Sequence, residues 1–208
     1  MADEDEKRKN ALNKLIDWMI ETGQQDVNEY IEKLKSLNPS ISTDDLARKI
    51  VRRKSLKNGL VGAATGLGGL ITLPVLIPAD LVLSWRIQIF IALSIAHVYG
   101  HNINTVDIKT DIYLILAGDS VKEALKKFGV EVSKGITKKT LEKYVTREVM
   151  KNIWKVIPQK VITKAGAKSS TSFLKMVPLV GAPIGFVFDW AATRAVGNMA
   201  IKYYGGGG

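Results

Sequence analysis

The chain has 208 residues, which is enough for a single domain with a substantial core, and we expect one domain. It contains no cysteine, which excludes disulfides, thiol catalysis and cysteine metal clusters. The net charge is +10 and lies in one segment, because residues 120–175 hold 14 Lys/Arg against 4 Asp/Glu while the rest is neutral. The first ten residues are charged and lack the apolar segment of a secretory signal peptide, so we expect no such signal there.

Apolar residues spaced three and four apart predict amphipathic helices in the N-terminal region, residues 1–41. We expect one helix over 5–21, ended at Thr22-Gly23, and a second helix over 26–37. Trp18, on the first of these helices, could lie at a membrane interface.

Ser42 and Asp45 have the spacing of a capping box, which predicts that a helix begins at Thr43. The end of this helix is strongly basic, and we expect it to continue into the glycine-rich stretch that follows. We therefore assign residues 42–205 to one helical domain and residues 206–208 to a glycine tail.

The stretch 59–79 contains no charged side chain over 21 residues. Four of its glycines recur at spacings of 3, 4 and 3, which places them on one helix face: Gly59, Gly62, Gly66 and Gly69. Such a face costs about 1 kcal/mol per glycine in helix propensity, and close packing against another apolar helix can offset that cost. Pro74 and Pro78 break the helix, and a second arm runs to Tyr99 with Gly100 as its C-cap. The pattern predicts an apolar helical hairpin at the centre of the fold.

Beyond the hairpin, we expect a helix over 106–117, capped by Asn104 or Thr105, and a short helix over 120–128. A basic helix over 137–157 should follow.

A second apolar unit covers residues 176–204 and contains Gly181 and Gly185, which we expect to join the glycine packing face. No convincing strand alternation occurs in the sequence. The predicted class is all-α, as a single helical bundle around the Gly/Pro-rich hairpin.

Four of the charged residues inside the two apolar units are candidates for buried ion pairs: Asp80, Arg86, Asp189 and Arg194. A buried charge without a partner is costly, and neither unit can pair its own two charges across one helix face. We expect crossed ion pairs, Asp80 with Arg194 and Asp189 with Arg86, which would hold the two units antiparallel. Exposure of these side chains to solvent is the alternative.

The hairpin could span a bilayer or form a protein core. Its first arm, residues 58–73, is about 24 Å long as a helix, whereas a hydrocarbon core is about 30 Å thick. Arg86 and Gln88 would raise the free-energy cost of inserting the second arm into a bilayer. These features favour a hairpin buried in a soluble or peripheral bundle, with the span as the alternative.

The sequence shows no recognisable catalytic or metal-binding pattern. His97 and His101 have ligand spacing, but Gly100 is expected to end the helix between them. The hydroxyl run 169–172 has no adjacent base, and the glycine run lacks the Lys-Ser/Thr of a phosphate loop. We predict no catalytic residue, no metal and no cofactor.

The basic segment is the stronger functional signal. Its cations recur mostly every four residues and are candidates for contact with a membrane surface: Lys138, Lys139, Lys143, Arg147, Lys151, Lys155, Lys160 and Lys164. Each lysine near an anionic membrane contributes about 1 kcal/mol. A solvated helix face is the alternative. Nucleic acid is disfavoured as a partner, because lysine predominates over arginine.

The hairpin and the C-terminal unit resemble the EcsC family of bacterial proteins. The resemblance covers residues 59–205 but not 1–45, and it is carried by Gly62, Gly66, Gly69, Pro78, Asp80, Arg86 and Tyr99-Gly100, then by Pro178, Gly181, Gly185, Arg194, Gly197 and Ala200. It implies a bacterial origin and association with the cytoplasmic side of the inner membrane. It also implies a link to a transporter affecting secretion, and no established catalytic activity.

These observations together predict a non-enzymatic, membrane-associated protein. We expect it to bind anionic phospholipid surfaces or a lipid, as an accessory to a transporter or envelope process. A helical adaptor or homo-oligomeric component of a membrane assembly is the first alternative. An enzyme with an unrecognised site near Asp80 is the second.

Overall fold

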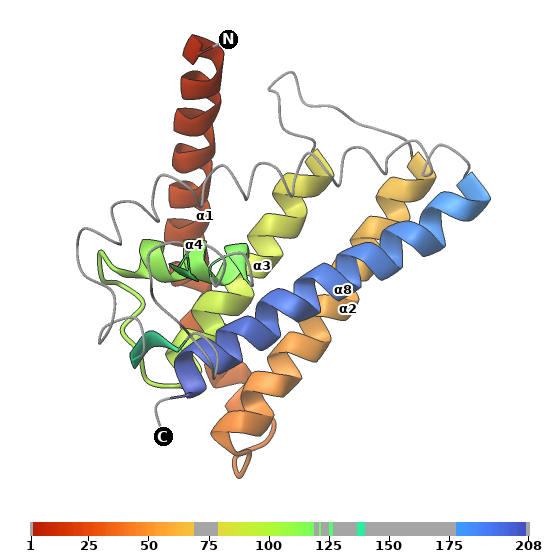
Figure 1. Ribbon diagram of the computed structural model, residues 1–208. Coiled ribbons are helices and arrows are strands. Elements are labelled where there is room, and N and C mark those ends of the chain that lie inside the picture. The colour runs from red at the N-terminus through yellow and green to blue at the C-terminus, as the bar shows by residue number, and fades with distance from the viewer. Residues whose placement is uncertain are drawn as a thin grey trace.

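The computed structural model describes residues 2–68, 79–118, 121, 125–126, 137–139 and 178–206. The elements within these ranges are helices α1 (Ala2–Ser36), α2 (Thr43–Gly68), α3 (Ala79–Val98), α4 (Ile108–Ala117) and α8 (Pro178–Gly205) (Figure 1). No strand occurs among the described residues, so the predicted all-α class is confirmed.

The N-terminal region is one continuous helix, α1, and the predicted break at Gly23 is wrong. A Cβ atom at Gly23 would lie 2.9 Å from the Leu93 Cδ1 atom of α3. The glycine therefore allows α3 to approach closely, and the helix continues through it. The apolar residues on both sides of Gly23, from Ile16 to Leu34, form one buried stripe against the core.

The predicted start of α2 and end of α3 are both confirmed. The Asp45 N–H donates to the Ser42 Oγ atom at 3.1 Å, which caps α2 at its first turn. At the end of α3, Gly100 has φ +79°, and its N–H donates to the His97 carbonyl at 3.0 Å. The His101 N–H donates to the Ala96 carbonyl at 2.9 Å, which completes a Schellman motif. The proline tip between α2 and α3 lies outside the described residues, so the hairpin stays a prediction.

α4 begins at Ile108, two residues later than expected, and Asp107 rather than Asn104 or Thr105 occupies its N-cap. The expected helices over 120–128 and 137–157 lie almost entirely outside the described residues.

α2 and α8 lie side by side and antiparallel, and they make the most extensive helix contact in the described part of the chain (Figure 1). A Cβ atom at Gly59 would lie 2.8 Å from the Phe186 ring, and one at Gly197 would lie 2.6 Å from both methyl groups of Val51. These glycines therefore permit a backbone approach that a side chain would block.

The close approach at Gly59 agrees with its predicted role. Gly62 and Gly66 lie in α2, Gly181 and Gly185 lie in α8, and Gly69 lies outside the described residues. Packing of these other glycines stays a prediction.

α3 is the central helix and contacts α1, α2, α4 and α8. Its aliphatic side chains from Ile89 to Ile95 are fully buried, which explains why this part of its sequence is largely apolar.

A buried polar cluster joins α3 to α2 and α8. The Asn58 amide donates to the Ser84 Oγ atom at 3.0 Å and to the Thr193 Oγ1 atom at 2.6 Å. The Gln88 amide donates to the same Ser84 Oγ atom at 3.1 Å. All four side chains are buried, so these hydrogen bonds give the two amide NH2 groups acceptors where water does not reach.

Candidate functional site: a basic pocket beside an apolar helix end

Close contacts fix which residues of α2, α3 and α8 lie at the same height. Asn58 of α2 contacts Ser84 of α3 and Thr193 of α8. Gly59 faces Phe186 of α8. Helices α3 and α8 both run antiparallel to α2, so residue numbers that increase along α2 correspond to residue numbers that decrease along α3 and α8. Leu60 therefore lies at the height of Leu83 in α3 and of residues 187–188 in α8.

Large apolar side chains are exposed at this height. Leu60 is 60% exposed, Leu83 46%, Val187 57% and Phe188 44%. Single exposed apolar side chains, such as Leu37, are common on protein surfaces. A group of exposed apolar side chains at the same height of three helices is not, and it suggests a binding surface.

The helix ends beyond this height carry no charge in α2 or α8. The uncharged part of α2, Leu60–Gly68, is about 13 Å long, and that of α8, Pro178–Phe188, is about 16 Å long. Figure 1 shows these two ends together at one extremity of the molecule. We call these two stretches, with Leu83, the apolar end. Asp80 is the second residue of α3.

Cations lie one to two turns from the apolar end on each of the three helices. They are exposed, and we call them the cationic band: Arg53, Lys57, Arg86 and Arg194. The Arg86 guanidinium lies 5.4 Å from the Trp18 ring centroid, and that of Arg194 lies 5.3 Å from Trp190. Tryptophan and arginine with apolar bodies and polar tips are suited to a membrane interface.

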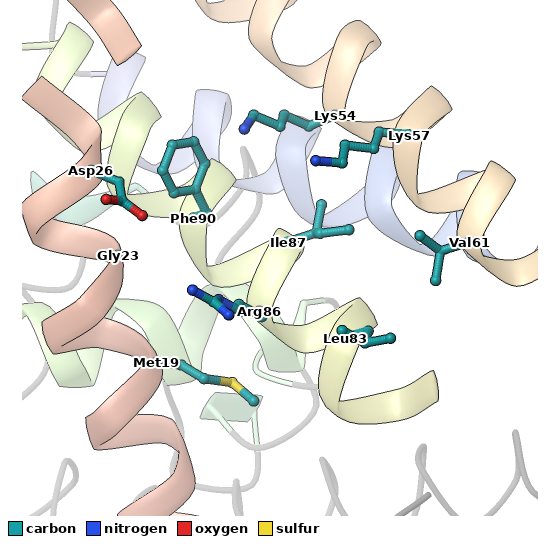
Figure 2. Close-up of a pocket in the computed structure, with 10 residues that line it drawn as sticks. All are labelled: Met19, Gly23, Asp26, Lys54, Lys57, Val61, Leu83, Arg86, Ile87 and Phe90. Atoms are coloured by element: carbon teal, nitrogen blue, oxygen red, sulfur yellow. The ribbon is translucent and has the colours of Figure 1, made fainter. Parts of the chain in front are cut away.

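A pocket of about 330 Å³ opens between α1, α2 and α3 at the height of the cationic band. Figure 2 shows Lys54 and Lys57 on α2, Arg86 on α3 and Asp26 on α1 around it. The remaining wall is mostly apolar: Met19, Val61, Leu83, Ile87 and Phe90. The pocket therefore combines three cations and one carboxylate with a hydrophobic lining.

Lys54 packs against two aromatic rings. Its ammonium lies 3.9 Å from the Phe90 ring centroid and 4.1 Å from that of Tyr30. Burial, together with the nearby charge of Lys57 and against the opposing charge of Asp26, lowers the pKa of Lys54 to about 8. An anion in the pocket would favour the charged form of this amine.

The four predicted ion-pair residues occupy different environments. Asp189 is buried at 1% exposure, but Arg86 and Arg194 are exposed and contact tryptophan rings. Both arginines lie at the surface against indole rings, which agrees with the alternative of solvent exposure for these two side chains, and the crossed ion pairs stay a prediction. The side chain of Asp80 lies outside the described residues.

One predicted membrane-surface lysine has a different partner. The Lys138 ammonium donates to the Asp111 Oδ2 atom at 2.8 Å, and the Asp111 carboxylate is buried. Tyr203 donates its hydroxyl to the Oδ1 atom at 2.6 Å, and Tyr204 to Oδ2 at 3.2 Å. Burial, with Asp111 as the second cause, raises the pKa of Tyr204. This cluster ties the end of α8 to α4, so Lys138 is occupied in the fold.

Lys139 is exposed, and the other predicted surface cations, Lys143, Arg147, Lys151, Lys155, Lys160 and Lys164, lie outside the described residues. The His101 ring nitrogen Nε2 lies 3.3 Å from the Tyr204 carbonyl. Within the described ranges, no three His, Asp or Glu side chains gather as a metal site.

The sequence alone did not identify the pocket. The basic run on α2 signalled part of it, since Lys54 and Lys57 precede the glycine face directly. Asp26 gave no signal, because its role depends on how α1 lies against α3.

None of the helices, as far as they are described, has the length and hydropathy of a membrane span. Comparison with curated proteins and with solved structures finds no match. The EcsC protein family model matches residues 4–205, so the N-terminal helix lies inside the match and the expected limit at residue 59 is wrong. Because this match covers nearly the whole sequence, the chain belongs to the EcsC protein family.

Proposed function

We propose that this protein is a non-enzymatic peripheral protein of anionic membranes. In this proposal the apolar end enters one leaflet and the cationic band lies at the level of the phosphates. The observation that carries it is the shared height of the exposed residues Leu60, Leu83, Val187 and Phe188, with cations one to two turns away on the same three helices.

The dimensions support insertion into one leaflet. The uncharged ends of α2 and α8 measure about 13 and 16 Å, close to half of a hydrocarbon core of about 30 Å. Each large apolar side chain moved from water into lipid contributes about 1.5–3 kcal/mol, and each cation at an anionic surface contributes about 1 kcal/mol. The basic segment 120–175 would add to the electrostatic attraction.

The location follows from the same reasoning. The cytoplasmic leaflet carries the negative surface potential that basic segments bind. We therefore propose the cytoplasmic side of a bacterial inner membrane, with an accessory role beside a transporter or in an envelope process.

Vesicle flotation with the full chain tests the proposal. We expect the protein to float with vesicles that contain phosphatidylglycerol and to stay unbound with pure phosphatidylcholine. Leu60→Ser should weaken vesicle binding by about 10-fold, because one leucine no longer enters the lipid. Leu37→Ser is the matched control, since Leu37 is 64% exposed but lies after α1, away from the apolar end.

Binding to neutral and anionic vesicles alike, or to neither, contradicts the electrostatic part of the proposal. Equal losses for the two leucine variants contradict the role of the apolar end. A homo-oligomer that covers the apolar end is the competing possibility, and light scattering without detergent separates it. An oligomer that Leu60→Ser dissociates, together with a lack of flotation, would replace membrane binding with assembly.

A further inference from the structure

The pocket crosses the boundary between the apolar end and the cationic band. Its wall includes Val61 and Leu83, which lie at the height of the apolar end. It also includes Lys57 and Arg86, which belong to the cationic band. Lys54 lies one turn further from the apolar end, above the rings of Tyr30 and Phe90. A ligand in this pocket would therefore meet cations at one height and apolar side chains at the other.

The charges indicate an anionic group. Three cations face a single carboxylate, Asp26, so the pocket has an excess of two positive charges when all three cations are charged and Asp26 is ionised. Arginine and lysine bind phosphate through charge-assisted hydrogen bonds, with the guanidinium fork giving the geometry. Lys54, whose pKa is lowered to about 8, is mostly charged at neutral pH, and an anion beside it would stabilise that charged form. A phosphate monoester, which carries nearly two negative charges, complements this set.

The rest of the wall indicates an attached hydrocarbon. Met19, Ile87 and Phe90 line the pocket together with Val61 and Leu83, and an inorganic anion would leave these side chains without a matching surface. A volume of about 330 Å³ is at the small end of ligand pockets, which suits a headgroup and the first part of a chain.

We propose that the pocket binds one phosphate-bearing amphiphile, with the phosphate between Lys57, Arg86 and Lys54 and the chain leaving past Val61 and Leu83. This assignment rests on the proposed membrane function only for the continuation of the chain into the bilayer. The same phosphate chemistry could come from a lipid headgroup or from a small water-soluble phosphate, and the test separates these sources.

Calorimetric titration of the full chain with dihexanoyl phosphatidic acid, a short lipid used below its micelle concentration, tests the site. We expect one-to-one binding, at least 10-fold tighter than that of dihexanoyl phosphatidylcholine or of glycerol 3-phosphate. Equal affinity for glycerol 3-phosphate overturns the amphiphile in favour of a soluble phosphate. A lack of binding overturns the site.

Two arginine variants provide a matched comparison. Arg86 and Arg194 are both exposed in the cationic band, and both lie about 5 Å from a tryptophan ring, but only Arg86 lines the pocket. Arg86→Gln should lower the affinity for the short lipid by at least 10-fold, and Arg194→Gln should leave it unchanged. Equal effects of the two variants contradict the pocket.

Comparing short-lipid binding with vesicle flotation distinguishes the two proposals. If the short lipid fails to bind but anionic vesicles still do, the pocket assignment fails and the membrane proposal stands. If the short lipid binds and vesicles do not, the membrane proposal fails and the pocket stands. Lys57→Gln, at a second exposed position of the pocket, repeats the loss of affinity independently of any folding defect caused by Arg86→Gln.

Discussion

Replacing Gly197 by alanine tests the close approach between α2 and α8. An added Cβ atom would lie 2.6 Å from both the Cγ1 and the Cγ2 atoms of Val51, and 3.1 Å from its Cβ atom. Valine is stiff about χ1, so its methyl groups cannot turn away without strain. The backbones of the two helices would have to separate by several tenths of an ångström.

The expected change is a difference of two effects. Alanine gains about 1 kcal/mol over glycine in helix propensity, whereas overpacking of a core contact costs about 1–3 kcal/mol. We expect a net loss of about 1 kcal/mol, which lowers Tm by about 2–4 °C in a chain of this size. Asn198→Ala, at the exposed neighbouring position, should instead raise Tm slightly, because it gains propensity without a clash.

Calorimetry or urea unfolding measures both variants. Adding Val51→Ala to Gly197→Ala should restore part of the loss, with a coupling free energy of about 1 kcal/mol, because the new methyl group fills the vacated space. If Gly197→Ala is as stable as the original protein, or if the double variant shows no coupling, the close approach at this position is refuted.

Three further predictions concern stability. Asp111→Ala should lower the free energy of unfolding in urea by about 3–5 kcal/mol, because it leaves the Lys138 ammonium and two tyrosine hydroxyls without their buried acceptor. Asp17→Ala, which removes a half-exposed ion pair, should lower it by less than about 1 kcal/mol, and equal losses for the two variants contradict the cluster. Gly100→Ala should cost about 1–2 kcal/mol, since φ is +79° with open space around the position, and an unchanged urea midpoint contradicts this. The unfolded state alone keeps the Lys54 proton between pH 8 and about 10.4, so the free energy of unfolding should rise with pH across that window. Lys54→Met should flatten this rise, and an identical pH profile contradicts the perturbed amine.

Local sequence signals correctly predicted two of the helix ends. The pair Ser42 and Asp45 located the start of α2, and Gly100 located the end of α3, because capping depends on residues that are close in the chain. Gly23 misled the same reasoning. Its helix continues because Leu93 lies against it, and no local pattern contains that neighbour.

The candidate site depended on information that periodicity does not hold. The basic run of α2 and the tryptophan Trp18 were visible in the sequence, but their common height with Arg86 follows from how the helices are aligned. Asp111 lies in a short apolar helix and meets Tyr203 from the far end of the chain. A lone carboxylate among aliphatic residues was the available sign that it had a distant partner.

The amide of Asn58 has a consequence for how uniquely the chain folds. Smooth, small-residue surfaces such as those at Gly59 and Gly197 could nest equally well after sliding along each other by a helical turn. A slide of about 5.4 Å would leave the amides of Asn58 and Gln88 among apolar side chains without their hydrogen-bond partners. Each lost partner would cost about 1–3 kcal/mol of stability. A few buried polar atoms thus select one alignment of helices whose apolar surfaces alone would allow several.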